Sequence, residues 1–139
     1  MKQGYTAYRS ANIDTADQGK LILITYDIAI KHAKLALEIF DDHKQLETRT
    51  KHLFKTQDAI TELLSALRLD VGDVAQNLYR LYDYMLRSLV DANVKNNKNK
   101  VTEVIGYLET LREAWTEAIS KVKQQSSSPI EMNSVGISG

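Results

Sequence analysis

The sequence contains few residues that interrupt a helix, no residue that can form a disulfide, and no net charge. Its 139 residues include no cysteine, one proline and six glycines, and 18 Lys and Arg balance 18 Asp and Glu. Without cysteine there is no thiol nucleophile, no thiolate-bound metal centre and no disulfide. We therefore expect the protein to be located in a reducing compartment. A net charge of zero argues against sequence-independent nucleic-acid binding, which needs a basic face to neutralise phosphates. We therefore expect any partner to be a protein.

Long apolar runs are also missing. No stretch approaches the ~18 uninterrupted apolar residues of a membrane span. The N-terminus has Lys2 followed by polar residues, without the apolar region that a secretion signal carries. We expect a single domain that is neither inserted in a membrane nor processed for secretion, and large enough to bury a core without disulfide or metal support.

Helical periodicity is what the sequence does contain. Apolar residues recur at steps of three and four, the spacing of helices that bury one face. Four such stretches lie between breaks at 41–44, 70–72 and 95–99. Connections of roughly two to six residues force consecutive helices to lie antiparallel. The sequence therefore predicts an all-α, antiparallel up-down four-helix bundle over residues 17–123, with a flexible N-terminal arm at 1–16 and a disordered tail at 124–139.

Short polar motifs indicate where the helices begin. Asp17 can accept hydrogen bonds from the free amides of the first turn, and Thr15 with Gln18 offers an alternative capping box. The candidates for the later helices are Asp73 with Gln76 for the third and Asn97 for the fourth.

Motifs for catalysis or metal binding do not stand out. No Glu-x-x-His pair, glycine-rich phosphate loop or nucleophile elbow occurs. His43 and His52 could meet across the first hairpin, near Asp41 and Asp42, but exposed imidazoles beside solvated carboxylates are ordinary surface. We expect no enzyme, no metal and no other cofactor.

The first helix carries more apolar surface than one small core can take. Two stripes run along it, displaced by about two residues, or ~200° of rotation, so one helix cannot turn both into the same core. The surplus apolar surface of this helix belongs to a wide buried face, is covered by another segment of the chain, or binds a partner. Surplus apolar residues on the next two helices favour a protein-binding groove. The first stripe is Leu21, Ile24, Ile28, Leu35 and Ile39; the second is Leu23, Tyr26, Ile30, Ala33, Leu37 and Phe40; the surplus residues are Phe54, Leu63, Leu69, Tyr79, Leu86, Val90 and Val94.

The N-terminal arm fits the same idea. Residues 1–16 lack helical periodicity, yet contain Tyr5 and Tyr8. Tyrosine is a good anchor because it contributes a large contact area at low entropic cost. An arm that docks these tyrosines on the surplus apolar surface would act as a lid, covering the site in the empty protein and yielding to a partner. Alternatively, the tyrosines simply pack against the end of the bundle.

Four segments carry a resemblance to a known family. They are Tyr5-Thr6-Ala7-Tyr8, then Lys20-Leu21-Ile22-Leu23-Ile24-Thr25-Tyr26-Asp27, then Leu81-Tyr82-Asp83-Tyr84-Met85-Leu86-Arg87-Ser88-Leu89-Val90-Asp91-Ala92-Asn93, and the block from Gly106-Tyr107 to Trp115. With these segments at matching spacing, the chain resembles the flagellar secretion chaperone family FliS, which binds flagellin in the bacterial cytoplasm. Ile28 departs from the family pattern, which usually has glycine there.

The resemblance implies a function as well as a fold. A FliS-like bundle wraps the disordered C-terminal segment of flagellin, prevents its premature polymerisation and delivers it to the export gate protein FlhA. The family resemblance also implies that the tyrosine-bearing arm can occupy the flagellin site when no client is present. It implies neither a cofactor nor nucleic-acid binding nor insertion in a membrane.

The client contacts are expected on three helices. A disordered client loses entropy when it binds, and a large contact area of helix-in-groove type must outweigh that loss. The competing interpretation is a structural or regulatory bundle that homodimerises through the second stripe, without a disordered client. The predicted flagellin-binding groove is Tyr26, Ile30, Ile60, Leu64, Leu67, Tyr82, Met85 and Leu89, some of which are expected to be core, with Tyr5 and Tyr8 as the lid.

Overall fold

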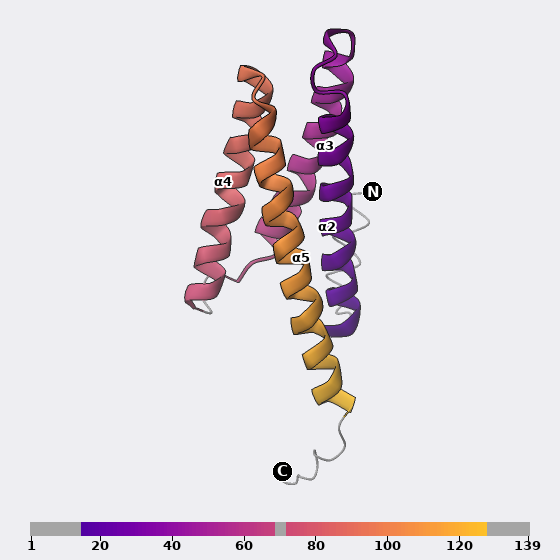
Figure 1. Ribbon diagram of the computed structural model, residues 1–139. Coiled ribbons are helices and arrows are strands. Elements are labelled where there is room, and N and C mark those ends of the chain that lie inside the picture. The colour runs from indigo at the N-terminus through magenta and orange to yellow at the C-terminus, as the bar shows by residue number, and fades with distance from the viewer. Residues whose placement is uncertain (1–14, 69–71, 128–139) are drawn as a thin grey trace. The chain divides into compact units, whose positions relative to one another are not determined.

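The chain folds into helices throughout the part that the computed structural model describes, residues 15–68 and 72–127. The predicted all-α, antiparallel up-down arrangement of four α-helices is confirmed, and these residues include no β-strand (Figure 1). The elements are α2 (Thr15–Glu38), the 3-10 helix η1 (His43–Gln45), α3 (Leu46–Ser65), α4 (Asp73–Lys95) and α5 (Lys98–Ser127).

Two helices extend past residues 17 and 123, the bounds that the sequence suggests for the bundle. Helix α2 begins at Thr15, two residues before Asp17, and α5 continues to Ser127, four residues into the predicted tail. Most of the predicted arm and tail lies outside the described residues. Asp17 stands inside the first turn of α2 rather than before it.

The start of α4 differs from the prediction, whereas the start of α5 agrees with it. The N-cap position of α4 is Gly72, at φ 128°, a conformation that glycine adopts far more easily than other residues. Asp73 is the first helical residue, so the predicted capping box with Gln76 is wrong. At α5 the side chain of Asn97 accepts a hydrogen bond from the Asn99 amide at 3.2 Å, which confirms the predicted cap.

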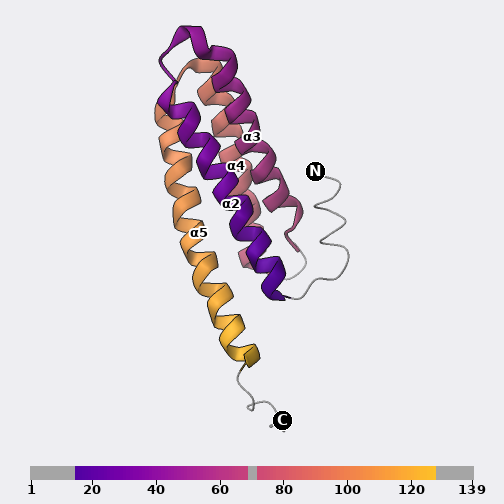
Figure 2. The ribbon, with the colours of Figure 1, turned by 90° about the vertical axis from the view of Figure 1, so that its right-hand side faces the viewer.

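Residues 24–111 form one compact unit with its own core. Within this unit α2 lies between α3 and α5, and α4 lies across the core from α2 (Figures 1 and 2). Alanines on the inner face of α2 let its neighbours approach closely, while the larger side chains of the other helices fill the centre. The side chains that are essentially without exposure include Tyr26, Ala29, Ala33, Ala36, Leu53, Thr56, Ile60, Tyr82, Met85, Leu89, Val101, Val104 and Leu108.

A buried arginine joins the ends of three helices in this unit. Arg49 of α3 is only 3% exposed. Its guanidinium donates to the carbonyl of Phe40, just past α2, at 3.0 Å, and to the carbonyl and side chain of Asn93 on α4, both at 3.1 Å. It also donates to the side chain of Asn96 at 3.0 Å and lies over the Phe40 ring, 4.2 Å from its centroid. Arg49 therefore supplies donors to carbonyls near two helix C-termini, where helices lack partners of their own.

The second unit contains, among the described residues, 15–23 of α2 and 112–127 of α5. Gly19 is buried there. A Cβ atom on Gly19 would lie 2.9 Å from one side-chain carbon of Ile119 and 3.0 Å from two others. The two helices approach each other so closely at this point that any larger residue must displace Ile119.

The two helical glycines should respond oppositely to alanine. At Gly106, exposed on α5, an added Cβ meets nothing within 4 Å. Gly106→Ala should therefore raise the free energy of unfolding by about 0.5 to 1 kcal/mol, through helix propensity alone. Gly19→Ala gains the same propensity but pushes against Ile119, and should be neutral or destabilising. Urea denaturation measures both; equal stabilisation by the two variants would contradict the close approach at Gly19.

Candidate client-binding surface

The first stripe of α2 lies outside the core. Ile24 and Ile28 remain 45% and 44% exposed, whereas Tyr26, Ala33 and Phe40 of the second stripe are at most 3% exposed. The expectation that one helix cannot bury both stripes is confirmed within residues 24–111. A homodimer through the second stripe would need a face that this structure uses for its own core.

A second apolar surface runs along the outer sides of α3 and α4. Hydrogen bonds between Thr50 and Asn93 set the antiparallel register of these helices. One turn further along each helix in opposite directions, Phe54 and Val90 come level with each other, and they are 55% and 53% exposed. The α3–α4 surface comprises Phe54, Leu64, Tyr79, Leu86, Val90 and Val94, of which Leu64 and Leu86 are half-buried.

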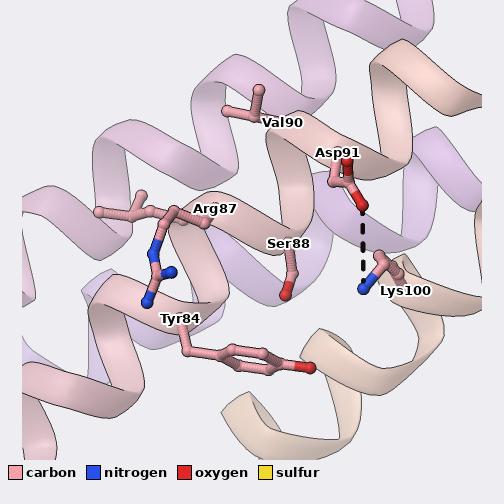
Figure 3. Close-up of a pocket in the computed structure, with 7 residues that line it drawn as sticks. Tyr84, Arg87, Ser88, Val90, Asp91 and Lys100 are labelled. Atoms are coloured by element: carbon pink, nitrogen blue, oxygen red, sulfur yellow. Dashed lines mark ion pairs between the residues drawn. The ribbon is translucent and has the colours of Figure 1, made fainter.

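A shallow hollow of about 470 Å³ lies against α4 and the start of α5. Figure 3 shows Arg87 and Val90 extending from α4, and Asp91 paired with Lys100 of α5 at 3.9 Å. The Tyr84 hydroxyl, also at this hollow, donates to Glu103 at 3.1 Å. The lining therefore mixes apolar, aromatic and charged groups, and the hollow adjoins the α3–α4 surface at Val90.

Five of the eight predicted groove residues lie in the core. These five are at most 1% exposed, and the hydroxyls of Tyr26 and Tyr82 hydrogen-bond to each other across the bundle at 2.5 Å. The remaining three are half-buried. The lid residues Tyr5 and Tyr8 lie outside the described residues. The buried five are Tyr26, Ile60, Tyr82, Met85 and Leu89, and the half-buried three are Ile30, Leu64 and Leu67.

The exposed residues of the α3–α4 surface have a signal in the sequence, although the predicted groove does not include them. Phe54, Tyr79, Val90 and Val94 stand out as surplus apolar residues beside the helical seams, and the structure exposes all four. The predicted groove consists of residues with the spacing of a helical seam, because periodicity indicates a buried face without showing what buries it. The signal that finds the outer surface is the surplus itself.

Two histidines meet between α2 and α3. The rings of His32 and His52 stack with centroids 5.1 Å apart, and their Nδ1 atoms are 2.9 Å apart. His52 therefore pairs with His32 and not with His43, the partner that the sequence suggested. Burial, followed by the charges of His52, Lys31 and Lys55, lowers the pKa of His32 from its usual 6.5. In the described residues no three His, Asp or Glu side chains gather closely enough to hold a metal ion.

The histidine pair should make stability depend on pH. Because the folded state lowers the pKa of His32, the unfolded chain takes up the proton first, and stability falls as the pH drops below 6.5. We expect the free energy of unfolding to decrease between roughly pH 7.5 and 5.5, the range in which histidine titrates. His32→Asn should flatten this dependence and the exposed His43→Asn should not. Urea titrations at each pH measure it, and an equal slope in both variants would contradict the assignment.

Apolar side chains exposed on several helices of a bundle are typical of one class of protein. Proteins of this class bind other polypeptides by packing them against their helices. Among the described residues no helix has both the length and the apolar character to cross a membrane. The chain belongs to the FliS family, whose model, flagellar protein FliS, matches residues 1–122. FliS is a family of flagellar secretion chaperones, as the sequence resemblance indicated.

Curated relatives agree along most of the chain. It is 34% identical over 120 residues to the flagellar secretion chaperone FliS of Bacillus subtilis, covering 86% of this chain and 89% of that protein. It is 31% identical over 131 residues to FliS of Salmonella typhimurium, covering 89% and 96%. It is 28% identical over 125 residues to FliS of Vibrio cholerae, covering 84% and 89%.

Proposed function

We propose that this chain is an export chaperone for flagellin in the bacterial cytoplasm. It binds the disordered C-terminal segment of flagellin, prevents premature polymerisation and delivers the complex to the export gate protein FlhA. The observation that carries the proposal is the apolar surface that remains outside a filled core, at Ile24 and Ile28 on α2 and along the α3–α4 surface. Membership of the FliS family supports the same client.

The client contacts the outer apolar residues first. Ile24 and Ile28 are exposed on α2, and the half-buried Ile30, Leu64 and Leu67 add further apolar contacts. The five buried residues of the predicted groove reach a client only if helices separate, so their contact with flagellin stays a prediction. Their present role is to hold the helices that display the outer residues.

The separation of the apolar surfaces suits an extended client. An amphipathic segment that orders on binding loses several kcal/mol to conformational entropy, so one compact pocket would give too little contact area. Apolar residues on α2, α3 and α4 allow the segment to contact more than one flank of the bundle. No reacting group is needed for this function, only burial of the client's apolar faces.

The test is a titration with a peptide of the last ~40 residues of flagellin, a length that can wrap a small bundle. We expect a 1:1 complex at micromolar concentration or tighter, with a gain of helical circular dichroism as the peptide orders. FlhA is expected to bind this complex better than the empty chain. Absence of a 1:1 complex at micromolar concentration would reject the proposal.

The lid formed by Tyr5 and Tyr8 is proposed as part of the same function. An arm that competes with the client should lower the apparent client affinity of the full chain. A chain that starts at residue 16 should therefore bind the flagellin peptide more tightly and bind more of a hydrophobic dye. Unchanged affinity together with unchanged dye binding would remove the lid from the proposal.

A further inference from the structure

The hollow against α4 and the start of α5 contains a buried hydroxyl without a partner. Ser88 is 3% exposed and lines this hollow of about 470 Å³. Among the described residues nothing hydrogen-bonds to its hydroxyl, which lacks even the bond to the preceding helical turn that Ser65 and Thr102 make. Figure 3 shows the hydroxyl directed toward the part of the hollow where Tyr84 and Lys100 lie. A buried hydroxyl without a partner destabilises a fold, and a bound acceptor would remove that cost.

Lys100 contributes a cation that has no carboxylate of its own. It lines the same hollow, and its ammonium lies 3.9 Å from Asp91, too far for a hydrogen bond. Asp91 is closer to Lys95, at 3.2 Å, so two lysines share one carboxylate. Lys100 also stands in the first turn of α5, where the free amides of a helix attract anions.

The other charged groups beside the hollow have partners. Arg87 holds Asp83 through Nε at 3.1 Å and through Nη2 at 3.0 Å. Glu103 accepts a hydrogen bond on each carboxylate oxygen, from Tyr84 and Tyr107, both at 3.1 Å. The groups that remain are an ammonium and a hydroxyl, and both are donors. A ligand that carries negative charge and accepts hydrogen bonds would complete this set.

We propose that the hollow binds an acidic side chain, Asp or Glu, of the polypeptide client. The carboxylate accepts hydrogen bonds from the Ser88 hydroxyl and the Lys100 ammonium. Lys100 turns from Asp91 to the client, while Asp91 keeps Lys95, so that no charge is left without a partner. The inference rests on the proposed function and adds which kind of client side chain this chain selects.

The position of the hollow favours a side chain over a chain end. Val90 belongs both to the hollow and to the α3–α4 surface, and it is 53% exposed. A client segment that packs an apolar residue on Val90 therefore brings a neighbouring polar residue to Ser88 and Lys100. A segment that continues along α4 in this way meets the hollow with its side chains rather than with its terminal carboxylate.

The first test removes the cation. Lys100→Gln should bind the C-terminal flagellin peptide about fivefold more weakly or worse, because a charge-assisted hydrogen bond is lost. The difference between wild type and Lys100→Gln should disappear with a peptide whose Asp and Glu are replaced by Asn and Gln, and should persist with a peptide whose C-terminus is amidated. The matched control is Lys95→Gln, which removes the same charge from beside Asp91 but lies outside the hollow, and should change affinity less than about twofold.

The second test removes the hydroxyl. Ser88→Ala should raise the urea midpoint of the empty chain, since it deletes a buried polar group without a partner. The same variant should bind the acidic peptide more weakly and bind the Asn and Gln peptide like the wild type. A hydroxyl with a purely structural role would give the opposite sign, a lower urea midpoint in the alanine variant.

Calorimetric titration at about 50 mM salt, where screening is weak, measures the affinities. Equal affinity of wild type and Lys100→Gln for the acidic peptide overturns the proposal. A difference that vanishes with the amidated C-terminus, or a lower urea midpoint for Ser88→Ala, also overturns it. If the wild type binds none of the peptides, the proposed function fails and this inference fails with it. Tight binding that is indifferent to Lys100 and Ser88 rejects this inference alone.

Discussion

Arg49→Ala should lower the free energy of unfolding by about 3 kcal/mol. The substitution leaves the carbonyls of Phe40 and Asn93 and the side chain of Asn96 without the donor that each now uses, and it leaves the side-chain oxygen of Asn93 with Thr50 as its remaining donor. Each buried acceptor left without a partner costs about 1–3 kcal/mol, although water that enters at partly exposed atoms recovers some of it. The lost contact with the Phe40 ring adds to the cost.

Lysine at this position should recover only part of the loss. The ammonium of lysine keeps the charge near the helix C-termini. It lacks the planar fork of donors with which the guanidinium of arginine reaches acceptors on three segments. Arg49→Lys should therefore lie between the wild type and alanine, about 1–2 kcal/mol below the wild type. Urea denaturation with an unchanged m-value measures both variants.

A surface cation on the same helix is the matched control. Lys51 is 72% exposed and lies 3.9 Å from Glu47 on α3. Lys51→Ala should change stability by no more than ~0.5 kcal/mol, because exposed pairs contribute little. If Arg49→Ala lowered the free energy of unfolding as little as Lys51→Ala, the hydrogen bonds of the arginine would not stabilise the contact between α2, α3 and α4. A whole domain is stable by only about 5–15 kcal/mol, so the expected difference is easily measured.

The architecture was predictable because helix periodicity is a local property. Steps of three and four with few interruptions predict the number and order of the helices, and the short connections predict their antiparallel directions. The displaced stripes of α2 were predictable in the same way, since rotation per residue decides whether Ile28 and Tyr26 can share a face. The structure buries Tyr26 and leaves Ile28 exposed.

The client surface was less predictable, because burial depends on neighbouring helices. Tyr82 and Leu89 repeat at the spacing of a buried seam, and the same spacing serves a groove that holds a partner helix. Only the packing of α4 against the rest of the bundle shows that these two are core, whereas Val90 beside Leu89 is exposed. An apolar residue just outside the seam is therefore the better candidate for contact.

Arg49 and Gly72 escaped prediction for a different reason. A charged residue at the edge of a seam is normally solvated, and the acceptors for Arg49 come from segments nine and 44 or more residues away in sequence. At Gly72 the sequence offers both a glycine and the acidic Asp73, and the capping motif favours the acid. The backbone instead takes the positive φ that glycine permits and starts the helix one residue earlier than the motif indicates.

Leu89→Ala and Ile28→Glu should separate stability from client binding. Leu89 is fully buried, so its truncation leaves a cavity and should lower the free energy of unfolding by about 2–5 kcal/mol. Its effect on the affinity for the flagellin peptide should be small, provided that binding is measured where the variant is folded. This result would place Leu89 in the core rather than among the client contacts.

Ile28→Glu should show the reverse pattern. A charge at a side chain that is 44% exposed changes stability little, but it must be desolvated when an apolar client covers α2. We expect the affinity for the flagellin peptide to fall more than tenfold, while Lys31→Glu, an exposed charge change on the same helix, leaves it nearly unchanged. Calorimetric titration measures affinity and urea denaturation measures stability. If Leu89→Ala weakened binding as much as Ile28→Glu while remaining folded, the client would enter between the helices, and the buried seam would be the groove.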